Sequence, residues 1–259
     1  MMWPRISVVT PSFNQGRFLE ETLRSVHDQG YPNLEHIVMD GGSTDGSVEI
    51  LRRYAPRLAH WVSEPDGGQT AALIRGFERA TGDILCWLNS DDLFEPWTLR
   101  EVAEFFQRSP RVRVVYGDTT WIDSLGRVLR SKREHAWNRF IWIYDHNFIS
   151  QPSTFWRRDV YEEVGGLDPQ WDFAMDGDLW IRFAEVTPLY HVRRLWSRER
   201  MYIDQKSQRF RAQCAAEDAL IRRRYLRNER EWARRPKQLA ARGIRVAWKL
   251  ASGCYTNAL

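Results

Sequence analysis

The chain has 259 residues, of which 43% are hydrophobic and 28% are charged. This composition is typical of a globular domain and excludes an intrinsically disordered chain. No run approaches the roughly 20 apolar residues of a transmembrane helix, which argues against a membrane-spanning chain. The net charge is +4, but eleven Lys/Arg and two Glu between Arg222 and Lys249 give that segment +9 and leave −5 for the rest.

The first half of the chain alternates short apolar or β-branched runs with amphipathic stretches. Strands are predicted at residues 6–10, 36–39, 61–63 and 84–88, and helices at residues 17–29, 48–54 and 68–80. Asn14 is expected to cap the first helix, because its side chain can accept a hydrogen bond from a free N–H group. Strands and helices that alternate in this way predict an α/β domain with a mainly parallel sheet and helices on both faces.

The second half of the chain is less regular. Strands are predicted at residues 112–116 and 128–131, and a helix at residues 178–184 with Asp178 as its N-cap. In the basic segment, Pro236 is expected to separate two helices, because proline cannot continue a helix interior.

The three cysteines, Cys86, Cys214 and Cys254, stand far apart in the sequence. An odd number at these spacings fits neither a zinc site nor a disulfide framework, so we expect a reducing cytoplasm. The first strand-like run begins close to residue 1, and we expect no signal peptide before it.

Three predicted strands end in clusters of polar residues, at the edge where open α/β sheets bind their ligands. The clusters are Thr10-Pro11-Ser12, Asp40-Gly41-Gly42-Ser43 and Asn89-Ser90-Asp91-Asp92. A turn explains any one of them, since Asp, Gly and Ser are common turn residues, but three at successive strand ends favour a binding site. The sequence has neither a P-loop nor the glycine fingerprint of dinucleotide sites, which argues against ATPases and dehydrogenases.

The adjacent carboxylates of Asp91 and Asp92 would repel one another unless a cation lay beside them. A hard divalent ion with oxygen ligands supplies such a charge and can also bridge to a diphosphate. There it would neutralise a nucleoside diphosphate as it leaves. Because Asp also caps helices, the pair by itself leaves both interpretations open.

The order of these motifs resembles that of the family-2 glycosyltransferases, which have the GT-A (glycosyltransferase A) fold. The matching segments are residues 8–14, 40–47, 88–92, 151–155, 165–168 and 175–180. The resemblance implies a nucleotide-diphospho-sugar donor, a divalent metal (Mn or Mg), and transfer to an acceptor hydroxyl with inversion of the anomeric centre. It implies a glycan or lipid-linked glycan as acceptor, in the synthesis of cell-surface polysaccharide or glycolipid.

The resemblance also implies roles for individual residues. The implied donor-binding residues are Thr10, Pro11, Ser12, Asp40, Arg75, Asn89, Ser90 and Asp91. Among these, residues 10–12 line the base and ribose pocket, Asp40 accepts hydrogen bonds from base or ribose, and Arg75 supplies a cation to the diphosphate. Asp91 and Asp92 are the implied metal ligands. Asp176 matches the catalytic base, which takes the proton of the acceptor hydroxyl, although a helix cap explains an Asp there too.

Three parts of the chain are expected on this basis. They are a nucleotide-sugar-binding half at 1–118, an acceptor-side half of the same GT-A domain at 119–207, and a basic helical extension at 208–259.

The sequence departs from the family pattern at four positions. Met175 replaces an acidic residue often found before the base, and Ala71 and Ile74 stand where many relatives carry Asp and Asn. Tyr202 stands where relatives often have a metal-coordinating His, and a phenol is a poor ligand for this ion. These departures favour an alternative, a nucleotide-sugar-binding protein of the same fold with weak or no turnover.

Thirteen tryptophans suggest sugar stacking, although most are expected in the core. Trp156, Trp171 and Trp180 lie beside the acceptor-side motifs and are the candidates for stacking.

Residues 220–250 interleave apolar side chains with eleven cations. A basic amphipathic helix of this kind can lie in a membrane interface, so an anionic membrane surface is a predicted partner and a peripheral position at its inner face is open. The alternative is that the segment packs on the catalytic domain or on a second copy in a homo-oligomer. No recognised nucleic-acid motif accompanies the arginine clusters, and we expect no nucleic acid partner.

Overall fold

A computed structural model describes residues 3–227, 229–251 and 254. In this part of the chain, nine strands form one sheet in the order β3-β2-β1-β4-β8-β6-β9-β5, with β7 paired to β6 off this path. The strands are β1 (Ile6–Ser12), β2 (Leu34–Asp40), β3 (His60–Ser63), β4 (Ile84–Trp87), β5 (Leu93–Phe94), β6 (Val114–Ile122), β7 (Val128–Lys132), β8 (Thr154–Arg157) and β9 (Leu189–Arg200). The α-helices are α1 (Gly16–His27), α2 (Ser47–Tyr54), α3 (Gln69–Arg79), α4 (Thr98–Arg108), α5 (Arg139–Tyr144), α6 (Arg158–Glu163), α7 (Met175–Val186), α8 (Lys206–Arg209), α9 (Arg211–Tyr225) and α10 (Glu231–Ala251).

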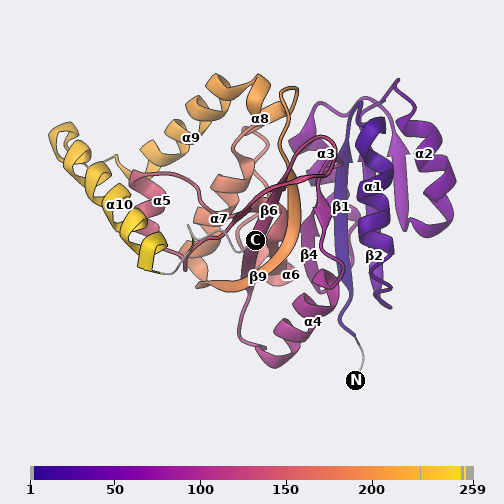
Figure 1. The fold of residues 1–259 in the computed structure, drawn as a ribbon, viewed down its shortest axis with the longest axis horizontal. Coiled ribbons are helices and arrows are strands. Elements are labelled where there is room, and N and C mark those ends of the chain that lie inside the picture. The colour runs from indigo at the N-terminus through magenta and orange to yellow at the C-terminus, as the bar shows by residue number, and fades with distance from the viewer. Residues whose placement is uncertain (1–2, 228, 252–253, 255–259) are drawn as a thin grey trace.

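The predicted parallel half is confirmed. Strand β1 pairs in parallel with β2 and β4, and β2 pairs in parallel with β3. Val38 of β2 packs with Leu23 and Leu51 of α1 and α2, whereas its neighbours Ile37 and Met39 belong to the cluster that includes α3. Successive strand residues point to opposite faces, so helices cover both faces of this half of the sheet (Figure 1), and β1, β2 and β4 are almost entirely buried.

The second half of the sheet is mixed. Strand β8 runs antiparallel to both β4 and β6, while β6 and β9 are parallel. The predicted strand at 112–116 is part of β6, which continues to Ile122 because β9 pairs with it as far as that residue. Strand β9 has no counterpart among the sequence predictions, since its seven ionisable side chains hide the apolar alternation that indicates a strand.

Both predicted helix caps are wrong. Asn14 adopts a left-handed φ of 51° and accepts a hydrogen bond from Thr44 N (2.9 Å), so it ties two loops together instead of capping α1. Asp178 lies inside α7, which begins three residues earlier. Its buried carboxylate pairs with Arg182 (2.8 Å) and Arg224 (3.4 Å).

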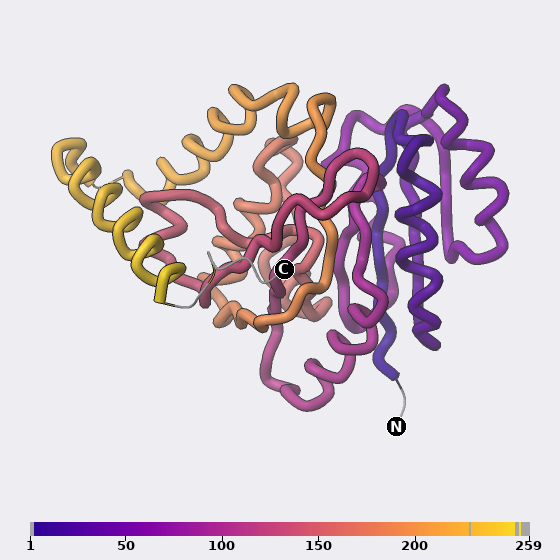
Figure 2. Tube along the Cα trace, viewed as in Figure 1, coloured from indigo at the N-terminus to yellow at the C-terminus, as the bar shows by residue number. Residues whose placement is uncertain are grey.

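The predicted extension at 208–259, which ends partly outside the described residues, contains α9 and α10. Pro236 does not separate them: it lies within α10, whereas α9 ends at Tyr225 and α10 begins at Glu231. Pro236 is the sixth residue of α10, where its missing N–H removes one helical bond and leaves the rest of the ladder intact. Figure 2 shows α10 as one continuous helix at the edge of the molecule. No helix among the described residues is long and apolar enough to span a membrane.

Candidate active site

The three polar clusters meet at the carboxyl edge of the parallel strands. Ser12 lies opposite Asp40 in the β1–β2 register, and Gly41 N donates to Ser12 O (2.8 Å). The third cluster follows β4, the other neighbour of β1, where Leu88 N donates to Val9 O (3.0 Å). The parallel register therefore brings residues 10–12, Asp40 and residues 89–92 to one side of the sheet.

Among the polar side chains of the first two clusters, some already have hydrogen-bond partners within the protein and one does not. Asp40 is fully buried, and its oxygens accept from Ser43 Oγ (2.6 Å), Ser43 N (2.9 Å) and Ser63 Oγ (2.6 Å). Thr10 Oγ1 lies 3.0 Å from His36 Nε2, inside the core. By contrast, the buried Ser12 hydroxyl has no hydrogen-bond partner in the described part of the chain. Buried polar groups are rarely left unpaired, so Ser12 is the side chain here that best fits a polar ligand.

The acidic pair is almost completely buried at the end of the loop between β4 and β5. Tyr202 Oη donates to Asp91 Oδ2 (2.8 Å), and Asp92 Oδ1 accepts from Arg200 N (2.9 Å). Burial raises the pKa of Asp91. Burial and the neighbouring Asp91 charge raise the pKa of Asp92 well above its usual range. An ionised pair in this position calls for an added positive charge.

The pair fits a divalent cation in chemistry, since carboxylate oxygens are the ligands of Mg²⁺ and Mn²⁺. Among the described residues, no cluster of three or more His, Cys, Asp or Glu side chains is arranged to hold a metal. The protein therefore offers one or two carboxylates, which is the arrangement Mg²⁺ adopts when substrate phosphates and water complete its shell.

A network missed by sequence reasoning surrounds Asn89. Its amide accepts from Gln69 Nε2 (2.9 Å) and donates to Gln151 Oε1 (3.1 Å). Lys206 Nζ, at the start of α8, donates to Gln69 Oε1 (3.2 Å) and pairs with Asp172 (3.1 Å). This network joins α3, the loop after β4 and α8 beside the acidic pair, while Ser90 is buried within that loop.

Arg75 lies on α3, six residues beyond Gln69, and is bonded to Glu64. Its Nη1 donates to Glu64 Oε1 (2.9 Å), whereas Nε and Nη2 are buried without a partner in the described chain. The guanidinium thus keeps unpaired donors, but its ion pair is directed toward the end of β3.

Asp176 stands in the first turn of α7, in a largely buried position. Burial raises its pKa to about 6, and the nearby Asp218 charge adds to the rise while Lys132 opposes it. Asn147 Nδ2 donates to Asp176 Oδ2 (3.0 Å). Because Asn147 Oδ1 accepts from Ile149 N (3.2 Å), the amide can present only its N–H₂ group to the carboxylate. The carboxyl group is therefore oriented by Asn147, and its pKa lies close to the range in which a general base works.

Residues 7–165 match the family model described as "Glycosyl transferase family 2". The chain belongs to this family. It is 30% identical over 200 residues to the PGL/p-HBAD biosynthesis glycosyltransferase of Mycobacterium bovis, a match that covers 74% of this chain and 76% of the relative.

Solved structures show the same fold for this family-2 chain. The S. aureus TarS fragment 1–349 in complex with UDP aligns with a TM-score of 0.66 at 18% identity, covering 88% of this chain and 68% of that one. The chain spans 42% of a longer TarS chain. The mannosyltransferase PcManGT from Pyrobaculum calidifontis, in complex with GDP-Man and Mn²⁺, aligns with a TM-score of 0.61 at 21% identity, covering all of this chain and 77% of that one. The predicted GT-A fold is thus confirmed, and the chain is a glycosyltransferase-family protein.

In this glycosyltransferase-family chain, α9 holds the segment that leads to Asp176. Glu217 of α9 accepts hydrogen bonds from three backbone N–H groups just before α7, those of Asp172 (3.1 Å), Phe173 (2.8 Å) and Ala174 (2.9 Å). These N–H groups belong to the loop that enters α7 and to its N-cap residue Ala174, and a carboxylate satisfies such donors well. Ile221 anchors α9 in the core. No local pattern predicts this contact, because the partners lie more than 40 residues apart.

The tryptophans near the acceptor-side motifs belong to the core. Trp156 and Trp180 are fully buried, and their ring centroids lie 5.6 Å apart. Trp171 is 6% exposed. None of the three presents a ring face on which a sugar could stack, so the core interpretation holds for them. Met175 is also buried, which explains an apolar residue before the carboxylate.

Proposed function

We propose that this chain is an inverting glycosyltransferase that moves a sugar from a nucleotide-diphospho-sugar to an acceptor hydroxyl. The observation that carries the proposal is Asp176: a carboxyl group in the first turn of α7, oriented by Asn147, whose pKa is raised to about 6. Carboxyl groups with raised pKa values are common at catalytic sites, which favours turnover over binding alone.

The donor site of the proposal is the carboxyl edge of β1, β2 and β4. Residues 10–12 and Asp40 would frame the base and ribose, with the unpaired Ser12 hydroxyl free to bond the ligand. Asn89, Ser90, Asp91 and Arg75 would border the diphosphate. Support comes from the fold neighbours TarS and PcManGT, which were solved with UDP and with GDP-Man.

A divalent ion, Mn²⁺ or Mg²⁺, would be held by Asp91, assisted by Asp92, and when bound would neutralise charge on the leaving diphosphate. Asp92 contributes mainly by position, because one of its oxygens accepts from Arg200 N. Tyr202 holds Asp91 in place through its hydroxyl (2.8 Å). The Mn²⁺ in PcManGT supports this assignment.

The chemical step follows from Asp176 as base. The acceptor oxygen attacks the anomeric carbon from the side opposite the leaving group, and its proton passes to a carboxylate oxygen of Asp176. The bond from the anomeric carbon to the diphosphate oxygen breaks as the new glycosidic bond forms. One displacement of this kind inverts the anomeric configuration. Asp176 must be ionised to act, so the reaction is supported above about pH 6.

The proposed acceptor is a glycan or lipid-linked glycan in cell-surface polysaccharide or glycolipid synthesis, with the enzyme in the cytoplasm or at the inner face of the membrane. The name of the M. bovis relative, which assigns it to PGL/p-HBAD biosynthesis, supports this choice. The proposed division at residues 118 and 207 remains a guide to the two halves of the site, with α9 contributing to the second through Glu217.

The proposal is tested by incubating the chain with a panel of UDP-, GDP- and dTDP-sugars, Mn²⁺ and glycan acceptors. We expect transfer from one donor, with a product of inverted anomeric configuration by NMR. A retained configuration would overturn the mechanism.

A second candidate is a nucleotide-sugar-binding protein without turnover. Tyr202 at a position where relatives often place a histidine, bonded to Asp91, favours it. Donor binding without transfer or donor hydrolysis, across the same panel, would decide for this candidate.

A further inference from the structure

The inner face of helix α10 packs against the rest of the protein. Ala241 is completely buried, and α10 packs along α5. Arg245 pairs with Asp145, and Lys249 Nζ lies 2.9 Å from Glu134 Oε2. Figures 1 and 2 show α10 lying against α5 at the end of the molecule. For the inner face of α10, the alternative that the basic segment packs on the catalytic domain is therefore correct.

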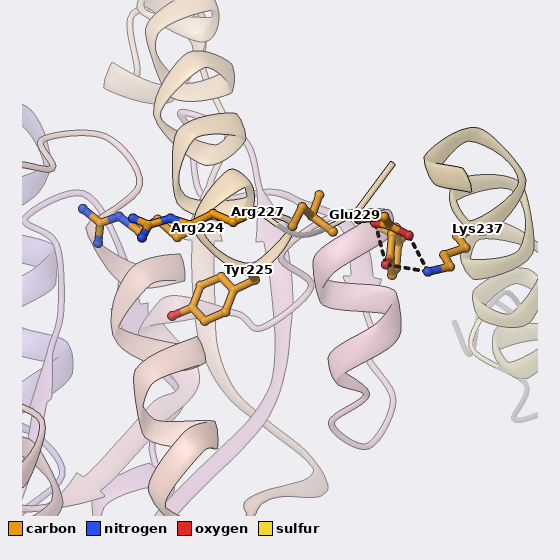
Figure 3. Close-up of a pocket in the computed structure, with 7 residues that line it drawn as sticks. Arg224, Tyr225, Arg227, Glu229 and Lys237 are labelled. Carbon is orange, nitrogen blue, oxygen red and sulfur yellow. Dashed lines mark hydrogen bonds and ion pairs between the residues drawn. The ribbon is translucent and has the colours of Figure 1, made fainter. Parts of the chain in front are cut away.

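A cavity of about 490 Å³ lies where α5, α9 and α10 meet (Figure 3). Its lining residues are Tyr144, Arg224, Tyr225, Leu226, Arg227, Glu229 and Lys237. Lys237 of α10 pairs with Glu229 and donates to Tyr144 Oη (3.3 Å). Helix α5, the segment that contains Glu229 and helix α10 thus share one polar network, which helps to fix the orientation of α10 on the domain.

The outer face of α10 is apolar and unpartnered among the described residues. Trp232, Leu239 and Leu250 are 74%, 66% and 64% exposed. At 100° per residue, the three lie within about 20° of one another and opposite Ala241. Three large apolar side chains in one exposed row cost free energy in water and mark an interaction surface.

Cations border this row. Arg235 and Arg242 lie along one side of it, and both are exposed. Together with Arg223, Arg227 and Arg230, they make no ion pair with any described residue. The exposed acid Glu231 also lies on α10, and its carboxylate is already 4.0 Å from Arg234. The surface around the apolar row is therefore positive.

We propose that the outer face of α10 docks on a lipid bilayer that contains anionic headgroups, with Trp232, Leu239 and Leu250 entering the interface and Arg235 and Arg242 meeting the headgroups. A bilayer satisfies both properties at once, since it buries apolar side chains and supplies negative charge beside them. A second copy of the chain would place this positive surface against itself. A nucleic acid would offer phosphates but no apolar medium for the exposed Trp and Leu side chains.

The docking surface extends the lipid-linked acceptor of the proposed function, but it is tested by binding alone. The full chain is required, because α9 and its Glu217 contacts hold the segment before Asp176. Flotation with phosphatidylcholine vesicles, with and without 30% phosphatidylglycerol, measures the partition coefficient. Donor binding is measured on the same protein samples by thermal shift. A chain that binds donor but not vesicles would contradict the docking surface without contradicting the proposed function.

Two double variants probe the surface. We expect Trp232→Ala/Leu239→Ala to lower partition into anionic vesicles at least about tenfold. Arg235→Gln/Arg242→Gln should lower it by about fivefold for each charge removed. Matched controls are Leu125→Ala and Arg111→Gln/Arg193→Gln, which change exposed residues of the same types elsewhere and should bind as wild type. High salt should release the wild-type chain.

The vesicle experiment has outcomes that support the proposal and outcomes that overturn it. Wild-type partition that depends on phosphatidylglycerol and is lost in both α10 variants supports the proposal. Equal partition of wild type and both α10 variants would overturn it. The absence of vesicle binding by the wild-type chain would also overturn it, and a concentration-dependent dimer or RNA binding that the same variants abolish would then identify the partner of this face.

Discussion

Replacing Asn147 with Ala removes the hydrogen bond that its Nδ2 donates to Asp176 Oδ2 across 3.0 Å. The bond favours the ionised carboxylate, so its loss raises the pKa of Asp176 above the present value of about 6. A hydrogen bond to a charged group contributes about 1.5–3 kcal/mol, or roughly one to two pH units. Because Asp176 is not completely buried, solvent replaces part of the bond, and we expect the lower end of this range.

The sign of the effect follows from the role of the carboxylate. Only the ionised base accepts the proton, so the acid limb of the kcat profile should move to higher pH by about one unit. The variant should then lose about threefold in kcat at pH 6.5 and almost nothing at pH 9. A merely structural role would lower kcat equally at every pH.

The assay is kcat against pH from 5 to 9 at saturating donor and acceptor. Asn33→Ala is the matched control, because Asn33 also donates from its side chain (2.9 Å, to Trp3 O) but lies far along the chain from α7. An acid limb that stays at the wild-type pH in Asn147→Ala would refute the reasoning.

Two further predictions concern the metal and α9. EDTA should abolish transfer and Mn²⁺ should restore it. Mn²⁺ with nucleoside diphosphate at about 100 times its Kd should raise the free energy of unfolding by about 2.7 kcal/mol in wild type and clearly less in Asp91→Ala; equal thermal shifts would contradict the metal assignment. Glu217→Ala should cost about 1–3 kcal/mol by leaving three N–H groups before α7 without their acceptor. Glu217→Gln, which keeps an acceptor oxygen, should recover part of that loss. Urea denaturation measures the free energy of unfolding of both variants. Wild-type stability in Glu217→Ala would refute the contact.

The sequence predicted the strand ends of the donor half well, and for a physical reason. Strands β1, β2 and β4 are buried on both faces, so each contains a short apolar run that stops at the polar residues of the ligand edge. Asp40, Asp91 and Asp92 follow directly from that pattern. Strand β9 could not be found in this way, because it carries charged side chains that pair with distant partners, as Arg198 does with Glu95.

The hydrogen bonds that orient Asp176 and the segment before it could not be predicted from local sequence patterns either. Asn147 lies 29 positions from Asp176, and Glu217 lies 43 positions from Ala174. Both depend on how the loop after α5 and helix α9 pack against the start of α7, which no spacing rule encodes. The errors at Asn14 and Asp178 arise because each residue was assigned to the nearest helix start. Distant partners, Thr44 and Arg224, engage these two side chains, and Arg182, one turn further along α7, also pairs with Asp178.

The central claim is that Asp176 is the base of a sugar transfer. Asp176→Asn keeps the size of the side chain but cannot take the proton, and Glu185→Gln, at the exposed end of the same helix, is its control. With the donor identified from the panel, kcat of Asp176→Asn should fall at least about 10²-fold while donor affinity and melting temperature stay near wild type. Wild-type kcat in Asp176→Asn would contradict the account.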